Sequence, residues 1–174
     1  MRPENRECHA VVYRKVRDTL ETSVYAQLEW AVDALGVTDK WRFTRSPMRA
    51  VYLPTGQRII FKGLDKAKKS KSIKVPFGYI KYLWFEEFDE FAGAEEIRNV
   101  QQSVIRGGQS FVVFKSMNPP RSARNWANSY MAEQRLRSDT YVSETTYLTA
   151  PAEWLGKPFM DVSGHPDRDR DRGL

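Results

Sequence analysis

The 174 residues include 41% hydrophobic and 29% charged side chains, a balance typical of one folded domain rather than of a disordered chain. No apolar run reaches the roughly 18 residues of a membrane span, and the N-terminus lacks the apolar core of a signal peptide, so we expect a cytoplasmic protein with no membrane partner. A single cysteine, Cys8, excludes a disulfide framework and a zinc site built from several cysteines. The net charge of +6 is compatible with a nucleic-acid partner.

The first part of the chain carries alternating strand and helix signals. The short apolar segment from Cys8 to Lys15 predicts a buried strand, and apolar residues spaced by three and four predict a helix from about Thr19 to Leu35. Asp18 and Glu21 have the spacing of a helix-capping pair. Three more strands are predicted, with turn residues between the last two that favour a hairpin: 41–44, 48–53 and 57–63.

The rest of the chain continues this alternation and indicates the fold class. The nearly unbroken apolar run 79–85 predicts a central strand covered on both faces, as in a parallel sheet. A helix, a buried strand, a second helix and an alternating strand are predicted after it: 94–105, 109–116, 123–137 and 140–148. Strands separated by helices predict an α/β fold with a mostly parallel sheet, to which the hairpin adds a local antiparallel element.

The strongest candidate site is the pair of carboxylates that follows the strand 79–85. Glu86 and Glu87 end this apolar strand in the form of a Walker B motif. The first carboxylate of such a pair can hold the water shell of Mg²⁺, and the second can orient or deprotonate an attacking water. The carboxyl ends of parallel strands are also where open α/β sheets bind ligands. The alternative interpretation is a strand that runs into an acidic surface turn.

Three weaker features also carry polar or basic groups. Ser116 ends the strand 109–116 and Asn118 lies two residues beyond it, where an amide could hydrogen-bond to a γ-phosphate or be part of a plain turn. Arg14 and Lys15 could face a phosphate or be surface cations. A lysine-rich loop could attract phosphates or be an ordinary solvated surface. Its lysines are Lys62, Lys66, Lys68, Lys69, Lys71 and Lys74.

Taken in order, six segments of the chain resemble the ATPase region of phage terminase large subunits. They lie within residues 8–160 and read VVYRKVRDTLETSVYAQLEWA, FKGLDKAKKSKSI, YLWFEEFDEF, IRNVQQSVIRGG, FKSMNPP and PAEWLG. The similarity is to the branch found with PBSX-like packaging genes in prophages. It implies a viral DNA-packaging motor, in which an N-terminal ATPase drives DNA into a procapsid and a C-terminal nuclease cuts the concatemer.

The resemblance also implies a fold, ligands, partners and residue roles. The implied fold is a three-layer, P-loop-NTPase-like α/β domain, and the ligands are ATP and Mg²⁺. Glu86 corresponds to the metal-shell carboxylate, and Glu87 corresponds to the carboxylate that activates water. Ser116, Met117 and Asn118 match the segment that couples hydrolysis to movement. The implied partners are double-stranded phage DNA, the small terminase subunit and the portal of the procapsid.

Two parts of the family pattern have no counterpart in the sequence. No G-x-x-x-x-G-K-S/T loop precedes the first strand, although the backbone amides and lysine of this loop are the main cradle for the phosphates. The metal-binding acids of the nuclease domain are also absent. We therefore expect residues 1–161 to be a partial ATPase domain without its first strand, Walker A loop and helix. Residues 162–174 are expected to be a divergent, disordered tail.

These departures leave the activity open. We expect little or no ATP hydrolysis by the chain alone, and an uncovered sheet edge that favours aggregation. The alternative is a non-catalytic remnant that binds DNA or a packaging partner through the lysine-rich loop. A third interpretation is a helicase-like ATPase that is not viral, and only the resemblance of FKSMNPP and PAEWLG argues against it.

Overall fold

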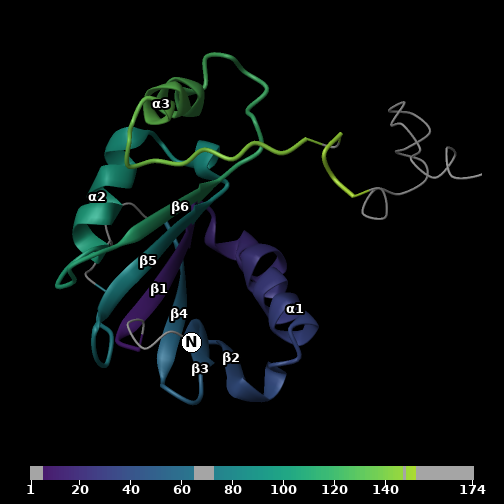
Figure 1. Ribbon diagram of the computed structural model, residues 1–174, viewed down its shortest axis with the longest axis vertical. Coiled ribbons are helices and arrows are strands. Elements are labelled where there is room, and N and C mark those ends of the chain that lie inside the picture. Colours follow the sequence, from purple (N-terminus) through teal and green to yellow (C-terminus); the bar gives the residue numbers. More distant parts are fainter. Residues whose placement is uncertain (1–5, 65–72, 147, 152–174) are drawn as a thin grey trace, which may run out of the picture. The chain divides into compact units, whose positions relative to one another are not determined.

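The computed structural model describes residues 6–64, 73–146 and 148–151, which divide into one unit up to Met131 and another from Ala132 onward. The first unit is built on one six-stranded sheet with the strand order β2-β3-β4-β1-β5-β6 (Figure 1). The strands are β1 (Cys8–Arg14), β2 (Trp41–Arg45), β3 (Met48–Tyr52), β4 (Gln57–Gly63), β5 (Tyr79–Glu86) and β6 (Val112–Ser116).

One side of the sheet is parallel and the other is antiparallel. β1 pairs in parallel with β4 and β5, and β5 pairs in parallel with β6. The strands β2, β3 and β4 form an antiparallel meander, in which Tyr52 faces Gln57 at the predicted hairpin turn. The predicted α/β class, with a mostly parallel sheet and a local hairpin, is therefore confirmed. The four parallel strands all end at the same edge of the sheet.

Helices cover both faces of the sheet, as a three-layer fold requires. α1 (Ala26–Ala34) lies on one face and α2 (Ala94–Val104) lies on the other (Figure 1). Because side chains alternate along a strand, β1 gives Val12 to the apolar cluster on the α1 face and Val11 to the cluster on the α2 face. β1 is therefore buried on both sides, which explains its continuous apolar run.

The first predicted helix is broken rather than continuous. It consists of a 3-10 turn η2 (Arg17–Thr19), a π-helical segment η3 (Glu21–Tyr25) and α1. Ser23 interrupts the segment with non-helical torsion angles of φ −111° and ψ −111°. The predicted pair Asp18 and Glu21 makes no side-chain capping hydrogen bond at these helix starts. Leu20, which lies between η2 and η3, is buried in one core with Val24 and Tyr25 of η3.

The two later helices form where they were predicted, with shorter bounds for the second. α2 agrees with the prediction of 94–105, and α3 (Trp126–Arg135) begins three residues later than predicted. Asn125 accounts for this start, because its Oδ1 accepts a hydrogen bond from Ala127 N at 2.9 Å. Two further 3-10 turns are η4 (Thr38–Lys40) and η6 (Phe88–Glu90). No helix in the described part of the chain is both long and apolar enough to cross a membrane.

β6 is an exposed edge strand, so the prediction of a buried strand at 109–116 is wrong. Among the described strands it pairs with β5 alone. Phe111, Val112 and Phe114 are 56%, 40% and 52% exposed. Apolar composition does not indicate burial here, because an edge strand with one uncovered face has the same sequence pattern as an interior strand; Val113 on the other face packs against the core. The alternating strand predicted at 140–148 is also wrong, because the described residues of that range contain no strand.

The unit from Ala132 onward is connected by local ion pairs. Arg135 pairs with Glu144, and Arg137 Nη2 lies 2.7 Å from Asp139 Oδ2. Hydrogen bonding from Arg137 holds the pKa of Asp139 at about 2. The tail predicted at 162–174 lies outside the described residues.

Candidate functional site

Charged and polar side chains meet where the parallel strands end. The register pairs Tyr13 with Phe85 and Glu86 with Ser116, so the ends of β1, β5 and β6 are level. Arg14, the residue after Tyr13, therefore lies beside Glu86, and Ser116 lies on the other side. The sheet brings the predicted site residues Glu86 and Ser116 together, at the edge where open α/β sheets bind ligands.

An ion pair links the two central strands at this edge. Arg14 Nη1 lies 3.3 Å from Glu86 Oε2, and Arg14 Nε lies 3.9 Å from Glu90 Oε2. The Arg14 and Glu86 side chains are only 13% and 12% exposed. Within the described residues, the buried atoms Arg14 Nε and Glu86 Oε2 make no hydrogen bond. The pair is therefore held by charge alone, and Glu86 Oε2 keeps its capacity to accept a hydrogen bond.

The setting of Glu86 also alters its titration. Burial raises the pKa of Glu86 above its usual value of 4.5, because the ionised carboxylate loses hydration. The charge of Arg14 opposes this shift, whereas the charges of Glu87 and Glu90 add to it. A titratable group perturbed by both burial and neighbouring charges is typical of functional sites.

Glu87 has a left-handed backbone, the only one among the described non-glycine residues, with φ 51° and ψ 56°. It is half-buried and opens the turn η6, in which Glu90 N donates to Glu87 O at 3.0 Å. The turn is anchored by Phe88, which is fully buried. An L-residue pays about 1 kcal/mol for this conformation, and residues held in such conformations cluster at functional sites.

The predicted coupling residues Ser116 and Asn118 lie at the end of β6. Trp84 Nε1 donates to Ser116 Oγ at 2.7 Å, which fixes the serine side chain to β5. Trp84 and Glu86 are alternate residues of β5, so the serine hydroxyl lies on the same face of the sheet as Glu86. Asn118 follows β6 by two residues and is exposed, and its side chain makes no hydrogen bond within the described residues.

Lys115 is a residue that the sequence analysis missed. Its Nζ lies 4.9 Å from the ring centroid of Tyr130 and 5.9 Å from that of Phe88. Phe88 follows Glu87 directly, so this cation–π contact connects the end of β6 to the turn that holds Glu87. The two rings lie far from Lys115 along the chain, and only the fold brings them together.

The lysine-rich loop is described only at its ends. Lys62 in β4 and Lys74 are exposed. The other four lysines lie outside the described residues, and they are Lys66, Lys68, Lys69 and Lys71. Phosphate binding by this loop stays a prediction.

The side chains at the strand ends could supply only some of the ligands that a magnesium ion needs. Among the described residues, no three His, Cys, Asp or Glu side chains group closely enough to hold a metal ion. Mg²⁺ needs only one or two carboxylates, because waters and substrate phosphates complete its shell. The buried oxygen Glu86 Oε2, which makes no hydrogen bond to any described residue, is an atom of the kind this ion requires.

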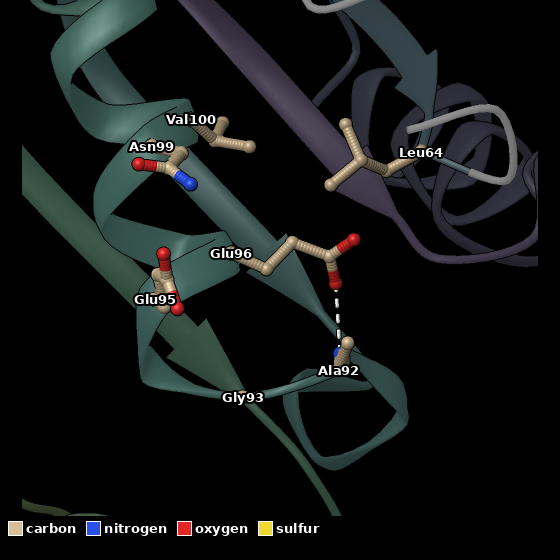
Figure 2. A pocket seen from close by; sticks show the side chains of 7 residues that line it. All are labelled: Leu64, Ala92, Gly93, Glu95, Glu96, Asn99 and Val100. Atoms are coloured by element: carbon tan, nitrogen blue, oxygen red, sulfur yellow. Dashed lines mark hydrogen bonds between the residues drawn. The ribbon is translucent and has the colours of Figure 1, made fainter. Parts of the chain in front are cut away.

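A separate cavity of about 310 Å³ lies at the start of α2. Figure 2 shows its lining: Leu64, Ala92, Gly93, Glu95, Glu96, Asn99 and Val100. Glu96 Oε2 accepts a hydrogen bond from Ala92 N at 2.7 Å, and Glu96 Oε1 accepts one from Lys15 Nζ at 2.6 Å. The lining contains none of the predicted site residues Glu86, Glu87, Ser116 and Asn118, so this cavity does not belong to the site at the strand ends.

Arg14 and Lys15 each have an acidic partner, Glu86 for Arg14 and Glu96 for Lys15. Phosphate contact by either cation stays a prediction. The sequence shows a basic residue, Arg14, and an acidic residue, Glu86, at the ends of two apolar strands. It does not show the register of the strands, and the ion pair follows only from that register.

Comparison with known proteins gives a consistent family. A family model described as phage terminase large subunit matches residues 2–162. The terminase large subunit of Bacillus phage SPP1 is 37% identical over 155 residues, which cover 87% of this chain and 36% of that protein. The PBSX phage terminase large subunit of Bacillus subtilis strain 168 is 33% identical over 90 residues, covering 51% of this chain and 20% of that protein. The chain thus spans about a third of the length of the SPP1 relative.

Proposed function

The chain belongs to the phage terminase large subunit family, and on this premise we propose that it is part of an ATP-hydrolysing motor that packages double-stranded viral DNA. The observation that supports the ATPase role is the meeting of Glu86, Glu87 and Ser116 at the carboxyl ends of adjacent parallel strands. The proposed partners are the phage DNA, the small terminase subunit and the procapsid portal, in the cytoplasm of the bacterial host.

In this proposal Glu86 and Arg14 prepare the metal site. Glu86 would hold the water shell of Mg²⁺ through its carboxylate, whose buried Oε2 makes no hydrogen bond within the described residues. When bound, Mg²⁺ supplies positive charge that stabilises the transferring phosphoryl group. Arg14 lowers the pKa of Glu86 against the effect of burial, and it thereby favours the ionised form that a metal shell requires.

Glu87 and the end of β6 supply the remaining roles. Glu87 orients and deprotonates the attacking water, and its position is set by the left-handed turn anchored at Phe88. Ser116, held by Trp84, and the exposed Asn118 contact the γ-phosphate side of the nucleotide and couple its loss to movement. For the chain alone we keep the expectation of little or no ATP turnover.

A chimera tests the ATPase role in a complete chain. The matched 155 residues of the SPP1 protein are replaced by those of this chain, and phosphate release is measured with Mg²⁺ and ATP. We expect turnover that falls about 100-fold or more in Glu87→Gln, because a general base contributes that much or more. Glu95→Gln, a change of an exposed glutamate on α2, is the matched control and keeps its turnover.

Two results would contradict the proposal. A folded chimera without ATP turnover argues against the ATPase role of this segment. Turnover that survives Glu87→Gln argues against Glu87 as the base, and turnover that survives Glu86→Gln at all Mg²⁺ concentrations argues against Glu86 as the metal-shell carboxylate.

A second candidate is a non-catalytic part that binds DNA through the lysine-rich loop. The exposure of Lys62 and Lys74, at the two ends of the loop, favours it. It predicts a salt-dependent DNA shift that weakens when Lys68, Lys69 and Lys71 become Ala, together with a chimera that does not hydrolyse ATP.

A further inference from the structure

Trp126, the first residue of α3, contacts both ends of the turn η6. The centroid of its ring lies 4.8 Å from that of Phe88, which begins the turn. Its Nε1 donates a hydrogen bond of 2.8 Å to the carbonyl oxygen of Phe91, the residue that follows the turn. Because Glu87 directly precedes Phe88, one side chain fixes the segment that follows Glu87 to α3.

The start of α3 is itself held by local contacts. Asn125 Oδ1 accepts the hydrogen bond from Ala127 N, and Asn128 Nδ2 donates to Ser122 O at 3.1 Å. Ala127 is fully buried in the core on the α2 face of the sheet, so the first turn of α3 packs closely against it. These contacts hold the helix start in place, so Trp126 offers the turn a fixed support.

Phe88 is enclosed by rings on more than one side. Tyr130 lies one helical turn after Trp126 on the same face of α3, with ring centroids 5.7 Å apart. Its centroid lies 5.2 Å from that of Phe88, and Phe85 of β5 contributes a third ring at 6.4 Å. A strained backbone such as that of Glu87 persists only where several neighbouring contacts hold it, and these rings supply such contacts.

We propose that Trp126 is a positioning residue for Glu87, which holds the left-handed backbone of Glu87 and thereby directs its carboxylate toward the attacking water. This role of Trp126 rests on the proposed function, in which Glu87 activates that water. Trp126 contacts the turn through Phe88 and Phe91, so it acts on the reaction only through Glu87. Displacing a catalytic group by about 1 Å can cost about 100-fold in rate, so a support of this kind affects turnover.

The first test measures the hold on Glu87 in the full chain, without nucleotide. Glu87→Gly removes the strain of the left-handed backbone, and the turn can already relax in Trp126→Leu. We therefore expect Glu87→Gly to lower the equilibrium constant of unfolding about fivefold more in the wild type than in Trp126→Leu. The effect of glycine on the unfolded chain is common to both and cancels. The control is Trp30→Leu, the same change at a tryptophan that is 72% exposed on α1, and it leaves the effect of Glu87→Gly unchanged.

The second test measures kcat and KM for ATP in the SPP1 chimera. We expect Trp126→Leu to lower kcat about 10-fold and to change KM less than about twofold, because Trp126 acts through Glu87 and not on the nucleotide. In the Glu87→Gln background, Trp126→Leu should lower kcat no further, since no carboxylate remains to be positioned. A general folding defect would instead lower kcat alike in both backgrounds.

A milder variant keeps both tests decisive if Trp126→Leu does not fold. Trp126→Phe keeps a ring against Phe88 and loses only the donor to the carbonyl oxygen of Phe91. We expect this variant to lower kcat about threefold and to show the same dependence on Glu87 in both cycles.

Three results would overturn the role of Trp126. The first is an equal effect of Glu87→Gly in the wild type and in the Trp126 variants. The second is wild-type kcat for the Trp126 variants in an active chimera, and the third is a loss of kcat that is as large in the Glu87→Gln background. A chimera without ATP turnover contradicts the proposed function instead. The unfolding cycle in the full chain then still decides whether Trp126 holds the backbone of Glu87.

Discussion

Arg14 and Glu86 end neighbouring parallel strands and pair with each other at 3.3 Å, with side chains only 13% and 12% exposed. Each side chain is the main compensation for the charge of the other, because the buried atoms Arg14 Nε and Glu86 Oε2 make no hydrogen bond within the described residues. Removing one member therefore leaves an uncompensated charge in a setting that is poor in water.

The first prediction is that Arg14→Met destabilises the protein in a pH-dependent way. Burial raises the pKa of Glu86 in the folded state, so its contribution to stability is present below 4.5 and is lost as pH rises through the folded pKa. Arg14 opposes that rise in pKa. Its removal therefore raises the folded pKa of Glu86 further, and stability is lost over a wider range of pH. We expect a cost of about 3 kcal/mol at pH 7.5 and a smaller cost at pH 4.5, measured by urea unfolding. Arg45→Met, which breaks an exposed ion pair, is the control. Equal costs of Arg14→Met at pH 7.5 and pH 4.5 would contradict the prediction.

The second prediction concerns His9, which is buried and joins three segments. Its Nδ1 accepts from Arg58 N at 3.0 Å, so Nε2 carries the proton and donates to Phe77 O at 2.9 Å. Burial lowers the pKa of His9 below 6.5, the Phe77 carbonyl partly offsets this, and the charge of Arg58 lowers the pKa further. The unfolded state then binds more protons, so stability falls as pH drops through 6.5.

Urea unfolding between pH 7.5 and 5.5 checks this contribution of His9. We expect the wild type to lose stability on acidification and His9→Gln to lose less, with the difference between the two curves isolating the imidazole. Glu86 acts in the opposite direction above pH 4.5, so the comparison with His9→Gln is needed. Parallel curves for the two proteins would show that His9 is not the titrating group.

The third prediction is that the ammonium of Lys115 stabilises the turn that holds Glu87. Lys115→Met keeps the length of the stem but removes the charge near the rings of Phe88 and Tyr130. We expect a loss of about 1 kcal/mol, and Lys115→Arg should retain most of the stability. A double-mutant cycle with Tyr130→Leu measures the contact itself, and strictly additive effects of the two changes would argue against it.

The fourth prediction is that Phe114→Thr lowers the tendency of the protein to aggregate. Phe114 is 52% exposed on the edge strand β6, where an unpaired apolar edge offers a template for another chain. Static light scattering during incubation at 37 °C should show slower growth for this variant. Leu136→Thr removes an apolar residue that is 88% exposed but lies outside any strand, and it should have little effect. Equal benefit from both changes would indicate that the edge itself is not the cause.

The fold was predictable from the sequence where local pattern decides structure. The apolar runs of β1 and β5, the turn between β3 and β4, and the periodicity of α2 each indicate an element without reference to the rest of the chain. Burial was not predictable in the same way. Val112 and Phe114 have the composition of an interior strand, and only the position of β6 at the sheet edge exposes them.

The sequence predicts the carboxylates of the candidate site, but it does not predict which side chains contact them. Glu86 and Glu87 are visible because a strand pattern ends at two acids, and Ser116 is visible for a similar reason. The pairing of Arg14 with Glu86 depends on the register between β1 and β5, which no local pattern encodes. Nor could the sequence indicate the left-handed backbone of Glu87, because glycine or asparagine is the usual residue in that conformation.

That left-handed backbone means that stability and chemistry prefer different residues at position 87. Glycine adopts a φ of 51° without steric cost, so Glu87→Gly relieves about 1 kcal/mol of strain while it deletes the carboxylate. A library selected only for resistance to heat should therefore accumulate glycine at this position, and a library selected for phosphate release should recover glutamate. After repeated rounds of selection, glycine at position 87 would indicate selection for stability, and glutamate would indicate selection for phosphate release.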